Sequence, residues 1–124
     1  LRAAPNRKAA VTWQVGKYMP LKKISEKSGW LQVEDVDGER HWVVKSAVSE
    51  KIICAVVKSS QATLRQRPSG SAPAIESGAV DKYTPFKRVG REDAWVQLED
   101  EYKTRSWANE KLLWWPVTRT SFKF

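Results

Sequence analysis

The 124-residue sequence predicts an all-β protein built from two consecutive small β-barrels. Three observations predict this fold: most of the chain consists of an internal sequence repeat, short stretches alternate between apolar and polar residues, and helix signals are confined to single turns. Glycine, proline and acidic turn residues separate these stretches at intervals of roughly 8–12 residues, which is typical of small all-β barrels.

The internal repeat has a constant offset of 65 residues, which relates Tyr18 to Tyr83. Three segments recur at this offset: 18–24 as 83–89, 29–35 as 94–100, and 40–43 as 105–108. Near the start the offset is 63, because the Leu-Arg-x-x-Pro motif at residue 1 recurs at residue 64. The second copy therefore holds two extra residues in the intervening loop. Copies of roughly 60 residues suit two small domains better than solenoid units.

We expect a first repeat over residues 1–50, a second over residues 51–116, and a C-terminal tail over residues 117–124. The join near residues 49–51 contains no Gly/Ser-rich or Pro-rich spacer. A short join of this kind predicts a fixed mutual orientation of the two repeats.

Each repeat contains a predicted β-hairpin. Residues 30–34 and 95–99 alternate with period two, which places Leu31 and Val33, and likewise Val96 and Leu98, on a core face. The Asp-Gly pair at 37–38 predicts a tight turn, whereas residues 100–104 lack glycine and predict a wider or different one. Return strands are expected over 40–44 and 105–109, each followed by one 3₁₀ turn, at 45–47 and 110–112.

A continuous apolar run from Ile52 to Val57 predicts a strand that opens the second repeat and extends to Thr63. Cys54 lies in this run and is the only cysteine, so no disulfide can form within the chain. We expect its thiol to be buried as a small apolar group. Further on, Trp114 and Trp115 are expected to pack against the barrels and hold the tail.

The order of these motifs resembles the bacterial SH3-like (SH3b) domain. That family opens with a strand ending in Leu/Val-Arg-x-x-Pro and closes with Gly-Trp-Val, a one-turn helix and a short strand. Residues 42–48 look like the close, and residues 107–113 are a looser copy. His41 and Ser106 stand where the family usually has glycine. The resemblance covers the chain up to residue 115.

The resemblance implies a non-catalytic binding module in the periplasm or outside the cell, although no leader peptide is visible. Its partner would be a peptide, a peptidoglycan stem peptide or another protein. It also implies a groove of exposed aromatics, formed by Tyr18, Trp30 and Trp42 in the first repeat and by Tyr83, Trp95 and Trp107 in the second. The alternative is that these aromatics fill the core or the interface between the repeats.

Catalytic chemistry has few candidate residues. His41, the only histidine, is predicted to be a surface residue of a return strand and is not expected to meet Cys54. The acidic pairs 34–35 and 99–100 recur at turns, which favours turn formation and solubility over hydrolysis by paired carboxylates. A zinc site needs three or four ligands, and a phosphate-binding glycine loop is absent. We predict no enzymatic activity, no cofactor and no metal.

The net charge is +8, from 22 basic and 14 acidic residues. Residues 1–50 contribute +3 and residues 51–124 contribute +5, so the excess is dispersed. A second hypothesis is a basic module that binds single-stranded nucleic acid by stacking and phosphate contact. Adjacent basic pairs such as Lys22-Lys23 and Lys87-Arg88 point to opposite sides of a strand, which disfavours it. A third is a structural or targeting accessory of a cell-wall enzyme. No apolar stretch is long enough to span a membrane, and the oligomeric state is left open.

The first repeat begins at Leu1 without a counterpart of the strand that opens the second. Its barrel therefore has an edge that must be covered, because unpaired backbone groups invite pairing. The simpler candidate is a segment preceding Leu1 that is not represented here. The other is the tail, in which Phe122 and Phe124 alternate with Arg119 and Lys123 as in a strand.

Overall fold

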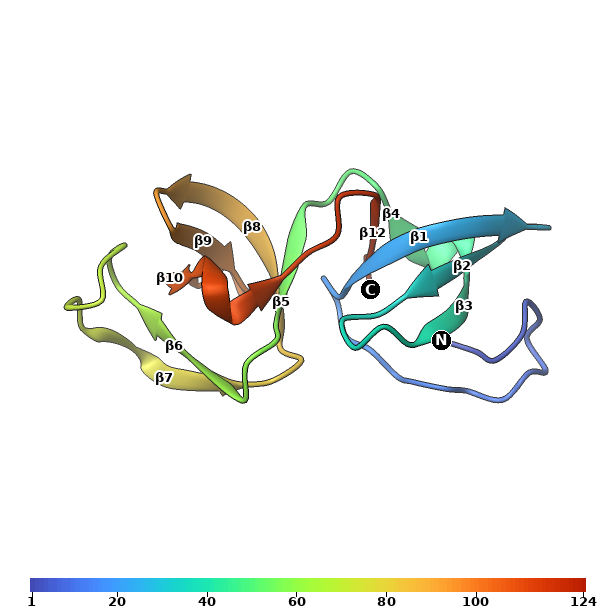
Figure 1. Ribbon diagram of the computed structural model, residues 1–124, viewed down its shortest axis with the longest axis horizontal. Helices are drawn as coiled ribbons and strands as arrows, with labels where there is room; N and C mark the ends of the chain where they lie inside the picture. Colours follow the sequence, from blue (N-terminus) through green and yellow to red (C-terminus); the bar gives the residue numbers. More distant parts are fainter.

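The computed structural model describes all 124 residues and contains twelve β-strands and two 3₁₀ turns joined by loops (Figure 1). No helix in it has the length and apolar character that crossing a membrane requires. The elements in chain order are β1 (Pro20–Lys27), β2 (Trp30–Glu34), β3 (Arg40–Val44), η1 (Lys45–Ala47), β4 (Val48–Ser49), β5 (Cys54–Val57), β6 (Gln61–Arg65), β7 (Ala74–Asp81), β8 (Pro85–Glu92), β9 (Trp95–Glu99), β10 (Arg105–Asn109), η2 (Glu110–Leu112), β11 (Leu113–Trp114) and β12 (Arg119–Phe122).

The strands form two antiparallel sheets, each curled around its own apolar core. The first sheet has the order β3-β2-β1-β12-β4, and the second has the order β11-β5-β8-β9-β10-β6-β7. We call residues 1–49 together with β12 the first unit, and residues 52–115 the second unit. The fold is therefore all-β with two SH3-like barrels, as predicted. The units lie side by side, and both chain termini lie at the first (Figure 1).

The predicted alternation along the hairpin strands is confirmed. Leu31, Val33, Val96 and Leu98 are at most 2% exposed, and they belong to the two cores. Burial of each such side chain stabilises the fold by about 1.5–3 kcal/mol. The return strands β3 and β10 and the 3₁₀ turns η1 and η2 also have the predicted bounds.

The two hairpin turns have the same hydrogen bonds, contrary to the expectation that the second turn is wider or of a different type. Asp35 N–H donates to Glu39 O, and Asp100 N–H donates to Thr104 O, at 2.9 and 3.1 Å. Lys103, with φ 70°, takes the left-handed conformation that Gly38 has in the first turn. Each aspartate Oδ1 also accepts from two amides of its own turn. These bonds hold the turn in shape without glycine.

The strand predicted over residues 52–63 is two strands. β5 ends at Val57 and β6 begins at Gln61, with the intervening residues in a bend. Polar residues Lys58, Ser59 and Ser60 fall at this break, where the apolar run ends. β5 and β6 consequently lie in different parts of the second sheet.

In this structure the tail covers the open edge of the first unit, which was the second of the two candidates. β12 lies between β1 and β4, the position that β5 takes between β8 and β11. The registers agree at the 65-residue offset: Leu21–Thr120 corresponds to Phe86–Ala55, and Val48–Phe122 corresponds to Leu113–Val57. The flanking bonds agree too, because Tyr18 N–H donates to Phe122 O and Tyr83 N–H donates to Val57 O, both at 2.8 Å.

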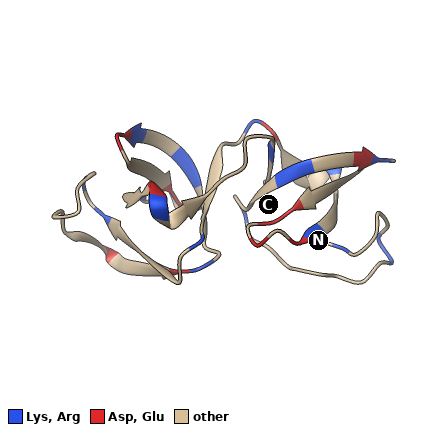
Figure 2. Ribbon diagram, viewed as in Figure 1, with Lys and Arg blue, Asp and Glu red and all other residues tan.

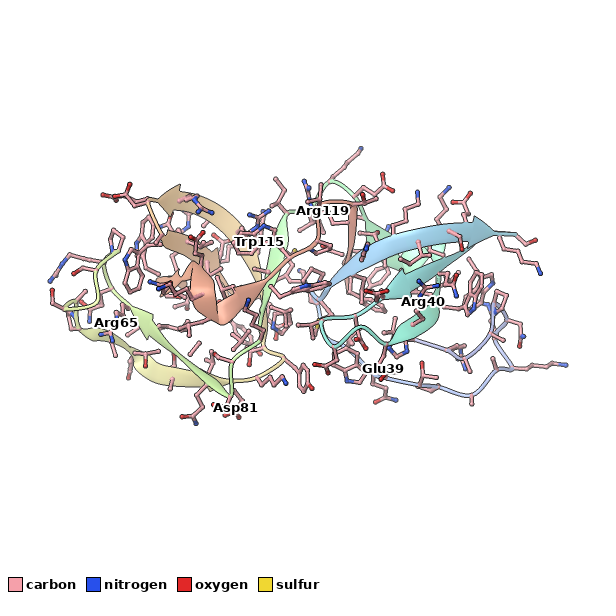
Figure 3. All side chains as sticks on the ribbon, in the orientation of Figure 1. Glu39, Arg40, Arg65, Asp81, Trp115 and Arg119 are labelled. Carbon is pink, nitrogen blue, oxygen red and sulfur yellow. The ribbon has the colours of Figure 1, made fainter.

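The two units share side chains at their junction. Val56 of β5 belongs to the core of the first unit, although β5 pairs within the second sheet. The consecutive tryptophans separate: Trp114 packs against the first core and Trp115 against the second. Trp115 and Arg119 lie in the middle of the molecule (Figure 3), and the Arg88 guanidinium lies 4.3 Å from the centroid of the Trp115 ring. The tryptophan pair therefore packs against both barrels, as predicted.

Cys54 is a free and fully buried thiol, as predicted. Burial raises its pKa to about 11, so the thiol stays protonated at neutral pH. We expect folded protein at pH 7.5 to react with a thiol reagent at least about 100-fold more slowly than protein unfolded in guanidinium, because both burial and protonation suppress attack. Stopped-flow absorbance with an aromatic disulfide measures both rates, and equal rates would contradict the burial.

Candidate functional site

One face of each hairpin presents an ordered set of aromatic and polar side chains. In the first unit, Gln32 of β2 lies opposite Trp42 of β3, Trp30 lies opposite Val44, and Glu34 lies opposite Arg40. Leu31, Val33, His41 and Val43 are buried behind them. Because directly opposite residues share a face, the tryptophans are diagonal neighbours with a glutamine between them. We call residues 30, 32, 34, 40 and 42 the first tryptophan face.

The second unit repeats this arrangement. Gln97 lies opposite Trp107, Trp95 opposite Asn109, and Glu99 opposite Arg105. Residues 95, 97, 99, 105 and 107 form the second tryptophan face. Both faces are bordered by the arginine of the Leu-Arg motif, since Arg2 bridges to Trp42 and Arg65 to Trp107. All four indoles are half-buried, so each packs on the sheet and keeps part of its ring in solvent.

Five of the six outward residues of the hairpin strands are retained between the units, whereas none of the four inward residues is. The sixth outward position is Val44 in the first unit and Asn109 in the second. Each tryptophan face has the same five residue types in the same order: Trp, Gln, Glu, Arg and Trp. Behind them, all four buried positions differ, with Leu31, Val33, His41 and Val43 replaced by Val96, Leu98, Ser106 and Ala108. Buried positions accept such exchanges when the volume can be refilled. Retention of five of the six outward residues therefore requires a reason other than core packing.

Cross-strand ion pairs border both faces. Glu34 Oε2 lies 3.6 Å from Arg40 Nε, and Glu99 Oε2 lies 3.0 Å from Arg105 Nε. The hydrogen bond from Arg105 holds the pKa of Glu99 below its ordinary value. Across the molecule, acidic and basic residues are distributed over both units (Figure 2).

Tyr18 and Tyr83 lie away from the tryptophans with which the sequence grouped them. Tyr18 precedes β1, whereas Trp30 lies opposite Lys27 at the other end of that strand. Both tyrosines have left-handed backbones, with φ 77° and 75°, and both face the neighbouring unit. The Tyr83 hydroxyl donates to Asp37 Oδ2 at 2.6 Å, which raises the pKa of Tyr83. The structure thus brings together Trp30 with Trp42 and Trp95 with Trp107, and assigns the tyrosines to the junction.

His41 is buried, contrary to its predicted place on the surface. It is 6% exposed, with Nε2 at 2.7 Å from Asp35 Oδ2 and Nδ1 at 2.6 Å from the Thr12 hydroxyl oxygen. An ionised carboxylate can only accept, so Nε2 is the donor to Asp35. The prediction failed because alternation along β3 places His41 on the inner side with Val43. The indole of Trp13 lies beside it, with ring centroids 6.2 Å apart.

A cavity of about 350 Å³ opens at the junction on the second-unit side. Its lining includes Leu64, Phe86 and Ser106 of the second unit, the turn after β9, and Tyr18 of the first unit. Sequence reasoning did not find this cavity. The available signal was the exchange of His41 for Ser106 between the retained arginine and tryptophan of the return strand, which replaces a ring by a hydroxyl. Elsewhere, no group of three His, Cys, Asp or Glu side chains is placed to hold a metal ion.

These features define a tandem small-barrel protein with a repeated aromatic surface. The sequence profile of the bacterial SH3 domain matches residues 1–50 and again residues 58–114. The chain therefore belongs to the bacterial SH3 domain family and contains two copies of the domain. Domains of this family are in general binding modules. No curated protein matches the chain in sequence.

Proposed function

We propose that the protein is a non-catalytic, bivalent binding module of the bacterial cell envelope that holds peptide on its two tryptophan faces. The peptide is a peptidoglycan stem peptide or an extended segment of a partner protein. The observation that carries this proposal is the retention of five of the six outward residues across the two units while all four inward residues change.

The retained residue types suit an extended peptide. An indole offers a wide, rigid apolar surface that stacks on apolar side chains and on peptide planes at small entropic cost. The amide of Gln32 or Gln97 both donates and accepts, as a peptide backbone does. The flanking pair of Glu34 with Arg40, or Glu99 with Arg105, supplies both signs of charge at the edge. Glu34 and Arg40 are both partly exposed, and ion pairs at such positions contribute little to stability, so folding alone does not require this pair.

Two identical faces on one chain also favour a polymeric ligand. Once one face is bound, the second face encounters neighbouring peptides at a high effective concentration, which strengthens binding without new contacts. Peptidoglycan presents its stem peptides repeatedly along each strand. We therefore expect whole peptidoglycan to bind more tightly than a single stem peptide.

Replacing one face tryptophan is expected to weaken binding while preserving the fold. Trp30→Ala and Trp95→Ala should each lower affinity for isolated peptidoglycan about tenfold or more, corresponding to about 1.4 kcal/mol, and the double variant should abolish binding. Isothermal titration and a peptidoglycan pull-down measure these effects, with circular dichroism as the check on folding. Phe124→Ala, a 73% exposed ring outside both faces, is the matched control.

Three outcomes would contradict the proposal. Full binding by the double variant would remove the tryptophan faces from recognition. Unfolding of both single variants would assign the indoles to the core. Submicromolar affinity for a single-stranded oligonucleotide at physiological salt would favour the nucleic-acid hypothesis instead, because dispersed charge predicts only weak, salt-sensitive binding.

A further inference from the structure

The junction cavity lies at a position that side-chain rings fill in the first unit and that is open in the second. In the first unit, that position holds the imidazole of His41 and the indole of Trp13. The ring of Tyr83 closes it, standing edge-on to Trp13 with centroids 5.4 Å apart. In the second unit, the corresponding position is the cavity of about 350 Å³, closed by Tyr18.

The correspondence is set by matching bonds on both sides of the cavity. The register aligns His41 with Ser106, because these residues lie opposite Val33 and Leu98. Arg2 Nη1 donates to Ala9 O as Arg65 Nη1 donates to Ala72 O, each at 2.8 Å. After the cavity, Tyr18 aligns with Tyr83.

The second unit therefore has no ring of its own for this place. Between these fixed points, residues 12–14 of the first unit are replaced by residues 75–79 of the second, and residues 75–79 include no aromatic residue. Trp13 thus has no counterpart. Ser106 puts only a small side chain where His41 has its imidazole, and it is 3% exposed.

The second unit has apolar side chains, an aromatic ring and a carboxylate oxygen around the cavity that could contact a bound ring. Leu64 and Phe86, at 2% and 4% exposure, give the cavity an apolar floor. Tyr18 lies at its first-unit side, as Tyr83 lies against Trp13. Asp100 uses Oδ1 for two turn amides, as Asp35 does. The Oδ2 of Asp35 accepts from His41, whereas the Oδ2 of Asp100 has no such ring to accept from.

We propose that this cavity is a ligand site for a flat aromatic ring with an N–H group on its edge, such as an indole or an imidazole. The ring lies on Leu64 and Phe86, meets Tyr18 edge-on, and donates its N–H to Asp100. The volume is at the lower end of the ~300–1,000 Å³ typical of small-molecule sites, and an engineered cavity of ~150 Å³ already holds benzene. None of the residues of the tryptophan faces lines this cavity, so the inference stands independently of the proposed function.

Titration of the full chain with indole, followed by ¹H–¹⁵N NMR, tests the proposal. We expect saturable shifts at Ser106, Phe86 and Tyr18 with a dissociation constant of roughly 0.1–1 mM, as suits a ligand of so few atoms. Imidazole should shift the same amides. Benzene, which lacks the N–H group, should bind at least about tenfold more weakly than indole. N-acetyltryptophanamide represents a free small molecule, and a peptide with one central tryptophan represents a side chain presented by a partner protein. The probe that matches the natural source should bind more tightly than indole.

Two variants separate occupancy of the cavity from general effects. Ser106→His rebuilds the arrangement of the first unit, with an imidazole beside Asp100, and should reduce indole affinity at least tenfold. Ser106→Ala leaves the space open and should retain binding within about threefold. Absence of shifts at 10 mM indole, shifts confined to the tryptophan faces, or equal binding by Ser106→His and the wild type would each overturn the proposal.

Discussion

Deletion of residues 117–124 is expected to unfold the first unit while the second stays folded. The deletion removes β12 from the middle of the first sheet and leaves β1 and β4 without a partner on one side. It also removes Phe122, which packs against the first core. A unit of about 50 residues has a free energy of unfolding of only ~3–8 kcal/mol. We expect the free energy lost with a central strand to exceed this value. Hydrogen exchange followed by NMR should show lost protection in β1–β4 and retained protection in β8–β10.

A synthetic peptide of residues 115–124 should restore protection when added to the truncated protein, because backbone pairing and the Phe122 contact can be supplied in trans. Thr120→Pro should reproduce the truncation, since proline within a central strand removes a donor and clashes. Val117→Ala, at a 93% exposed position outside β12, is the matched control. An unchanged melting temperature together with an unchanged mass in solution would show that β12 does not stabilise the first unit.

Asp35→Ala is expected to be the most destabilising single substitution at the hairpin turns. Asp35 is 4% exposed and accepts from His41 and from the amides of Asp37 and Glu39. Removing it leaves three donors without an acceptor, and each buried donor left unpaired costs about 1–3 kcal/mol. Guanidinium unfolding followed by tryptophan fluorescence measures the change.

The second repeat provides the matched control for this substitution. Asp100 makes the same two turn bonds but has no histidine, so Asp100→Ala should cost only about 1–2 kcal/mol. The difference between the two variants isolates the contact with His41. Adding His41→Ser to Asp35→Ala should recover part of the lost stability, because the unpaired imidazole is then removed. Equal effects of the two aspartate substitutions would contradict a stabilising role for the buried pair.

The local architecture could be predicted from the sequence. Period-two alternation identifies the strands at 30–34 and 95–99 and their inward faces, because successive side chains in a strand point to opposite sides. The return strands and 3₁₀ turns follow from the spacing of the repeated motif. The duplication itself, with its 65-residue offset, establishes two barrels. Each of these predictions rests either on a pattern within a few residues of the predicted feature or on the similarity between the two repeats.

Several features of the candidate sites lay beyond this local information. His41 lies on the same inward face as Val43, as alternation along the strand requires. A polar residue is nevertheless expected at the surface unless its buried partners are known, and Asp35 and Thr12 are seen to be its partners only in the structure. Tyr18 and Tyr83 share a motif with the tryptophans, yet their left-handed backbones turn them toward the neighbouring unit. The cavity results from the absence of side chains at a contact between two units, which no pattern within one unit encodes.

Two SH3-like barrels, the positions of their hairpins and most of the inward-facing hairpin residues could be predicted from the amino-acid pattern. That β12 closes the first barrel is seen only in the folded molecule, because Thr120 and Ser121, both fully buried there, give no apolar signal in the sequence. Their place is set by backbone pairing with β1 and β4, on strands about 100 and 70 residues earlier in the chain. Alternation predicts which side chains of a strand face the core. It does not predict which strand will be its neighbour, because that depends on the backbone N–H and C=O groups that the rest of the fold leaves unpaired.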